Sequence, residues 1–286
     1  MQYKLPNFLL IGSARSGTTS LYDNLIHHPD IYLSKVKEIE YFSKYYDRGL
    51  DWYASHFRNH NNESIIGEGS VSYSWPNRAD VPKRIRNTLG SDIKLVYMVR
   101  NPVKRAVSHF YTFMDNHYKD IEEELFGPKD EDAIGTYYIE TSRYSHFIEH
   151  YLRYFDRRNL KIIVFEDYIK DIEKYHKDVY SFLGLENTDF MPPDIDSKTN
   201  ALKKPKSGIA MKLYRALTYS RIRDILYPYI PNSFRRSSRQ MYRKLFFKQF
   251  KKNVPAEVEE RLYNELENEI TAMEKSLGRP LDIWRQ

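Results

Sequence analysis

The sequence contains no cysteine among its 286 residues, which excludes disulfide bonds and thiolate metal sites. It also lacks long hydrophobic runs, since no stretch approaches the ~20 apolar residues of a membrane-spanning helix. The first apolar run meets Gly12 almost at once and is too short for a signal peptide. Because cysteine is absent and no export signal is recognised, we expect a cytoplasmic protein.

Acidic side chains are nearly missing from residues 205–252, which hold thirteen Lys or Arg and the single acid Asp224. The whole chain has a formal net charge of only +6, so the excess is local. We expect short, aromatic-rich helices in this basic segment. They fit an anionic glycan, a glycolipid or peripheral contact with the inner membrane face, and a solvated helical face is an equal alternative. No nucleic-acid reader motif is present, so no specific nucleic-acid partner is expected.

Alternating apolar runs and amphipathic stretches predict an α/β fold, a P-loop-like doubly wound parallel sheet flanked by helices. Strands are expected at residues 7–11, 65–66, 93–99 and 160–165. Helices are expected around residues 21–26, 103–114, 144–155, 166–183 and 258–277, the last ending at Gly278. We expect residues 1–286 to form a single domain, with an acidic loop at 115–136.

The loop after the first strand has the composition of an anion site and reads Gly-Ser-Ala-Arg-Ser-Gly-Thr-Thr-Ser over residues 12–20. Two glycines five apart let backbone N–H groups curl around an anion at a helix N-terminus. The spacing matches G-x-x-x-x-G-K-[ST], except that Thr18 replaces the lysine. The next central strand ends in Arg100, where ATP-dependent phosphoryl transfer would want a carboxylate for Mg²⁺. A sulfuryl donor has less charge to neutralise, so an arginine suffices without metal.

Three segments together resemble the PAPS-dependent sulfotransferases, closest to their heparan-sulfate and bacterial branch. Residues 15–19, RSGTT, are similar to the family's 5′-phosphosulfate loop, and residues 100–109, RNPVKRAVSH, to its 3′-phosphate motif. Residues 34–42, SKVKEIEYF, resemble the segment that holds the catalytic glutamate. The resemblance implies transfer of a sulfuryl group from 3′-phosphoadenosine 5′-phosphosulfate (PAPS) to a hydroxyl or amine, leaving adenosine 3′,5′-bisphosphate (PAP). A carbohydrate or glycolipid acceptor and no metal are implied as well.

The same resemblance implies roles for individual residues. Arg15 stabilises the charge on the leaving group, and Glu38 is the general base. Glu40 competes with Glu38, because on an extended segment both would share a face. The donor is expected to contact Arg15, Ser16, Gly17, Thr18, Thr19, Ser20, Arg100, Ser108, Lys204 and Lys206.

Several features stay open at the level of sequence. Relatives usually have G-E-K-[ST] where this chain has Gly67-Glu68-Gly69-Ser70, so a lysine is missing. Tyr73 and Trp75 either line an acceptor cleft or belong to the core. His146 and His150 lack a third ligand, and we expect no metal site. Two other functions compete: a P-loop kinase using ATP and Mg²⁺, and a non-catalytic nucleotide- or polyanion-binding protein.

Overall fold

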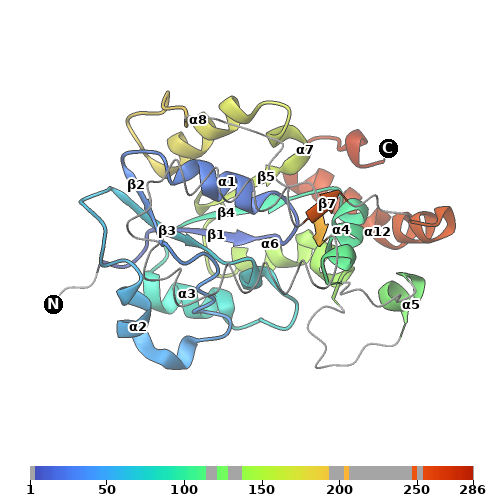
Figure 1. Cartoon of the computed structure of the whole chain (residues 1–286), viewed down its shortest axis with the longest axis horizontal. Coiled ribbons are helices and arrows are strands. Elements are labelled where there is room, and N and C mark those ends of the chain that lie inside the picture. The colour runs from blue at the N-terminus through green and yellow to red at the C-terminus, as the bar shows by residue number, and fades with distance from the viewer. Residues whose placement is uncertain are drawn as a thin grey trace. The chain divides into compact units, whose positions relative to one another are not determined.

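The structure, a computed structural model, describes residues 4–113, 121–127, 137–192, 203–205, 247–249 and 254–285. The chain divides into two compact units, residues 1–197 with 254–286, and residues 198–253. The first unit contains a five-stranded, all-parallel sheet in the order β2-β3-β1-β4-β5, which confirms the predicted α/β fold (Figure 1). The strands are β1 (Phe8–Gly12), β2 (Ile31–Leu33), β3 (Ile65–Gly69), β4 (Lys94–Val99) and β5 (Leu160–Val164).

Helices cover both faces of this sheet, because successive strand residues point to opposite sides and both sides are apolar. One face packs against α1, α7 and α8, and the other against α2, α3, α6 and α12 (Figure 1). The helices are α1 (Thr18–Leu25), α2 (Gly49–Ser55), α3 (Val81–Leu89), α4 (Pro102–Phe113), α5 (Ile121–Phe126), α6 (Tyr144–Leu152), α7 (Phe165–Tyr168), α8 (Ile172–Leu183) and α12 (Ala256–Leu277).

In the larger unit, five elements differ from the sequence-based expectation, and two of them are the helices α2 and α3, which were not predicted. The strand β2 was not predicted, because it is only three residues long. The expected helix over 166–183 is two helices, since the Asp171 side chain accepts a hydrogen bond from the Lys174 N–H and caps α8 as a new helix. Within the expected acidic loop, residues Ile121–Phe126 form the helix α5.

The basic segment can be compared with the expectation at only a few positions. Phe247–Gln249 forms a strand, β7, paired antiparallel with β6 (Lys203–Pro205), so the helix expected there is wrong at these residues. The rest of the segment lies outside the described residues. The single domain over 1–286 stays a prediction. None of the described helices combines the length and apolar character needed to cross a membrane.

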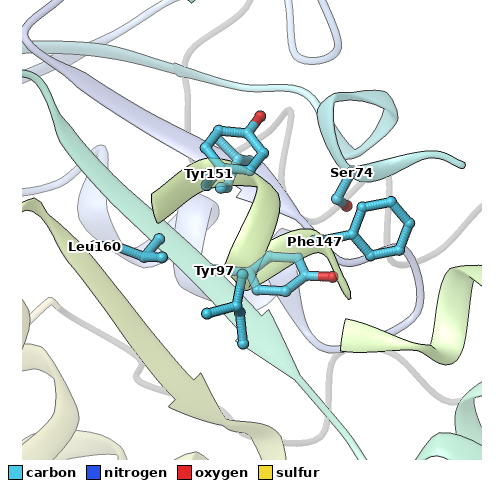
Figure 2. A pocket seen from close by; sticks show the side chains of 7 residues that line it. Ser74, Tyr97, Phe147, Tyr151 and Leu160 are labelled. Atoms are coloured by element: carbon cyan, nitrogen blue, oxygen red, sulfur yellow. The ribbon is translucent and has the colours of Figure 1, made fainter. Parts of the chain in front are cut away.

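The strand order places β1 between β3 and β4, so the carboxyl ends of these three strands are neighbours. Ligands of open α/β sheets bind at such a switch point. Close packing supports the β1 end: a Cβ at Gly12, whose φ is 141°, would lie 2.1 Å from the Ser74 Oγ. Behind this edge, Tyr97, Phe147 and Tyr151 surround a narrow space with an uncharged lining (Figure 2). That space offers an anion no charged partner, and we place the site at the strand ends instead.

Candidate active site

The loop between β1 and α1 presents several backbone donors that the protein does not use. Within the described part of the chain, the N–H groups of Arg15, Gly17, Thr18 and Thr19 have no protein acceptor. Arg15 and Gly17 have positive φ angles of 71° and 88°, so the backbone turns where helix α1 begins. A Cβ at Gly17 would lie 2.6 Å from the Phe165 ring, which requires glycine there. Unused N–H groups at a helix N-terminus form an anion-binding site.

Two arginines stand beside this loop. The Arg15 Nε donates to the Ser108 Oγ at 3.3 Å, and the Arg100 Nη1 donates to the Arg15 carbonyl at 3.3 Å. The structure therefore brings together Arg15, Arg100 and Ser108, which lie up to 93 residues apart in sequence. Burial, followed by the nearby charge of Arg100, lowers the pKa of Arg15. A bound anion would relieve that repulsion, because it neutralises both guanidinium groups.

A third arginine, Arg105, was part of the quoted motif but had no predicted role. It is fully buried in α4, and its guanidinium donates to the carbonyls of Ala14 and Tyr138 and to the Ser142 Oγ. Burial lowers its pKa to about 10, so the group is charged at neutral pH. Burial and then the Arg105 charge lower the pKa of His109 to about 2, and neutral His109 Nδ1 accepts from Arg105 at 3.2 Å. Arg105 therefore holds the backbone of the loop in place through the Ala14 carbonyl.

The hydroxyls expected in the donor site separate into two groups. Those of Ser16 and Ser20 bond inside the protein, to the Ser13 Oγ at 2.6 Å and the Tyr168 hydroxyl at 3.3 Å. The Thr19 Oγ1 lies on the exposed side and accepts from the Lys37 Nζ at 2.6 Å. For Lys204 only the backbone, in β6, is described, and Lys206 lies outside the described residues. The donor contacts of these residues stay predictions.

The segment that contains Glu38 and Glu40 is not extended. Both residues have positive φ angles, 61° and 56°, so the alternation that would place them on one face is lost. The Glu38 Oε2 accepts the Val71 N–H at 2.8 Å, and burial raises the pKa of Glu38. Glu40 instead lies 3.9 Å from the half-exposed Lys44 ammonium. The two carboxylates thus have different surroundings: Glu38 accepts a backbone N–H next to the end of β3, whereas Glu40 lies beside a lysine.

Lys37, which had no predicted role in the site, lies beside the N-terminal end of α1. Its Nζ donates to Thr19 and stands 5.7 Å from the centre of the Tyr22 ring. Burial lowers the pKa of Lys37, and the neighbouring Glu38 opposes that shift. A basic residue immediately before the expected base was the available sequence signal.

Glu68, at the end of β3, is completely buried and accepts hydrogen bonds from hydroxyls. Tyr53 and Tyr73 donate to its Oε1 at 3.2 and 2.5 Å, and Ser70 donates to its Oε2 at 2.7 Å. Burial raises the pKa of Glu68 to about 7, against the effect of these hydrogen bonds. Tyr73 therefore belongs to the core, the second of the two interpretations left open from sequence.

Comparison with known proteins gives the family. The sulfotransferase domain family matches residues 5–275. The chain belongs to the sulfotransferase domain family. Its members are transferases of the EC 2.8.2 class, and they use PAPS as the sulfuryl donor. The suspected resemblance is thereby confirmed.

Individual relatives of this sulfotransferase domain include glycan-modifying enzymes. Human heparan sulfate glucosamine 3-O-sulfotransferase 3B1 is 33% identical over 187 residues, 64% of this chain and 47% of that protein. The membrane-associated sulfotransferase kil1 of Dictyostelium discoideum is 40% identical over 110 residues, 37% of this chain and 23% of that protein. The chain thus aligns with less than half the length of either relative. The crystal structure of a sulfotransferase from Alicyclobacillus acidocaldarius has the same fold, with a TM-score of 0.72 and 24% identity, covering 99% of this chain and 100% of that one.

The buried Glu68 makes the stability of this sulfotransferase domain depend on pH. Its pKa rises from 4.5 unfolded to about 7 folded, so the folded state binds the proton more tightly between these values. Stability from this group is complete below pH 4.5 and is lost as the pH rises through 7. As the pH rises from 4.5 to 8, the unfolding free energy of the wild type should therefore fall by up to about 3 kcal/mol more than that of Glu68→Gln. Urea unfolding of both proteins between pH 4.5 and 8 measures this, and parallel curves would contradict it.

Proposed function

We propose that this chain is a PAPS-dependent sulfotransferase that modifies a hydroxyl or amine of a carbohydrate or glycolipid acceptor. The observation that carries the proposal is the loop before α1, where unused N–H groups stand beside Arg15 and Arg100. Such a cluster of donors and positive charge suits the phosphosulfate and phosphate groups of the donor. Ser108, hydrogen-bonded to Arg15, would contribute a hydroxyl next to them.

The proposed reaction is an in-line displacement at sulfur. The donor supplies an activated sulfuryl group. Glu38 takes the proton from the attacking hydroxyl or amine as its oxygen or nitrogen bonds to sulfur, and the bond from sulfur to the phosphate oxygen breaks. Arg15 stabilises the negative charge left on that oxygen, a contribution worth roughly 10²–10³ in rate. Lys37, between Glu38 and the loop, would add positive charge on the transferred group.

A glycan acceptor is supported by the name of one relative, the human heparan sulfate glucosamine 3-O-sulfotransferase 3B1, which acts on heparan sulfate. The cationic excess of residues 205–252 supports an acceptor that is itself anionic. A cytoplasmic location, expected from the absence of cysteine, remains a prediction.

Nucleotide preference tests the donor site. PAP should raise the melting temperature without metal, whereas ATP with Mg²⁺ should not, because Arg100 stands where a kinase would want a carboxylate. Arg15→Met and Arg100→Met should each weaken PAP binding by about 10- to 100-fold, the effect of losing a charged hydrogen bond. Isothermal titration calorimetry measures this.

The matched control is Arg86→Met, which removes an exposed arginine from α3. Its PAP affinity should equal that of the wild type. Stabilisation by ATP with Mg²⁺ and none by PAP would favour the kinase alternative and overturn the donor assignment.

The second test separates Glu38 from its neighbour. Glu38→Gln should lower kcat by about 10²–10⁴, because the attacking group then keeps its proton, while the PAP dissociation constant changes little. Glu40→Gln should stay within about threefold of the wild type. Turnover with labelled PAPS measures both rates, using a panel of heparan sulfate, unsulfated heparosan and glycolipid extracts. Full activity of Glu38→Gln would remove it as the base.

The role of the basic segment in acceptor binding can be tested by reversing the charge of its arginines. Changing Arg235, Arg236 and Arg239 together to glutamate should raise the acceptor KM about tenfold at low salt and less at high salt. The control reverses three exposed cations of the larger unit, Arg58, Lys83 and Arg86. An unchanged KM in the first variant, or an equal rise in the control, would contradict this role.

A further inference from the structure

The loop that holds Glu38 is fixed to the end of β3 by hydrogen bonds from its own backbone. The Glu40 N–H donates to the Ser70 Oγ at 3.0 Å, and the Phe42 N–H donates to the Tyr73 hydroxyl at 3.4 Å. The Glu38 N–H donates to the Gly69 carbonyl at 3.0 Å. The two hydroxyl acceptors therefore help to fix the path of the chain just after Glu38.

Both of these hydroxyls are in turn oriented by one carboxylate. Ser70 donates to the Glu68 Oε2 and Tyr73 to the Oε1, at 2.7 and 2.5 Å. A hydroxyl that gives its only proton to a carboxylate keeps its lone pairs for other donors. The Glu68 side chain thus turns two freely rotating hydroxyls into fixed acceptors that face the loop amides.

The loop needs such support because its backbone is unfavourable by itself. Glu38 and Glu40 both have left-handed φ angles, which non-glycine residues rarely adopt unless the surroundings impose them. In the part of the chain that the structure describes, the Glu38 carboxylate is held by one backbone donor, the Val71 N–H. Its position therefore follows the backbone of residues 38–42 and of the turn after Ser70.

We propose that Glu68 is a positioning residue for sulfuryl transfer, which acts through Ser70 and Tyr73 to hold the base Glu38 in place. This inference rests on the proposed function, since it takes Glu38 as the base. Glu68 itself does not touch substrate. Among the described residues no lysine or arginine pairs with it, so the hydroxyls are the groups that it orients.

The chain provides a matched control for this inference. Tyr53 and Tyr73 both donate to the same Oε1 atom of Glu68, and both are completely buried. Only the Tyr73 hydroxyl accepts a loop amide. Tyr53→Phe and Tyr73→Phe therefore remove the same kind of bond to the carboxylate, but only the second variant releases the loop.

Turnover rates at pH 8, measured with the acceptor of the panel that gives the highest rate, should distinguish these variants. Ser70→Ala and Tyr73→Phe should lower kcat about 10- to 100-fold, because small displacements of a base are costly, and leave PAP affinity within about twofold. Tyr53→Phe should stay within about threefold in kcat, whatever its melting temperature. Equal losses in Tyr53→Phe and Tyr73→Phe would overturn the inference.

Hydrogen exchange gives a readout that needs no acceptor. Peptides covering residues 38–44 should exchange faster in Ser70→Ala and Tyr73→Phe, and at the wild-type rate in Tyr53→Phe. Unchanged exchange in the first two variants would overturn the inference even if their activity fell.

A double-mutant cycle distinguishes failure of this inference from failure of the proposed function. In a Glu38→Gln background, Ser70→Ala should cause no further loss of kcat, because the group that it positions is gone. An inactive Glu38→Gln with a fully active Ser70→Ala would refute the inference alone. A fully active Glu38→Gln would refute the base assignment, and with it the inference that rests on it.

Discussion

The concentration of positive charge around one loop is the constraint on which the site depends. Arg15, Arg100 and Arg105 surround the turn before α1. Burial and then the charge of Arg100 lower the pKa of Arg15, and burial and then the charges of Arg100 and Arg15 lower the pKa of Arg105. The protein holds them largely with neutral acceptors, the carbonyls of Ala14, Arg15 and Tyr138. Neutral acceptors fix guanidinium groups without cancelling their charge. The loop therefore keeps a positive field, which Glu166 beside Arg100 offsets in part and an anionic ligand would neutralise further.

The sheet explains how distant residues reach this loop. Parallel neighbours place the ends of β3, β1 and β4 side by side, so Ser70, the loop and Arg100 meet at one edge. Gly69 fits this crowded edge because a Cβ there would lie 3.0 Å from the Tyr22 ring. The Tyr22 hydroxyl donates to the Ser34 carbonyl at 2.6 Å, which keeps the ring in place. A long side chain at position 69 would have to displace it, and Lys37 brings a cation over the same ring instead.

Much of this arrangement could be predicted from sequence because its signals are local. The strand–loop–helix order around Gly12, the strand before Arg100 and the cap at Gly278 depend on neighbours in the chain, and the structure has all three. The short β2 and the break before α8 were missed, because three apolar residues and one capping aspartate give little periodic signal. Sequence could not separate Glu38 from Glu40, since it does not reveal that both have positive φ.

The contacts that sequence reasoning missed are long-range. Arg105 reaches carbonyls 33 and 91 residues away, and Glu68 reaches a tyrosine 15 residues earlier. Spacing rules describe one helix face or one strand and say nothing of such partners. A charged residue within a sequence motif can therefore hold the backbone of a site in place, while another residue of the same motif faces the ligand.

Two carboxylates at the ends of β3 and β5 give one reason why this loop suits a sulfuryl donor better than a metal-bound triphosphate. Glu166 accepts the Asn101 N–H at 3.1 Å and the Trp284 indole N–H at 3.0 Å, and it lies 3.8 Å from the Arg100 Nε. Glu68 is occupied by three hydroxyls. Both acids are thus committed to holding protein groups, and binding Mg²⁺ would require breaking those bonds. Cationic side chains are left to balance the charge of the donor, as Thr18 in place of a phosphate-binding lysine already suggested.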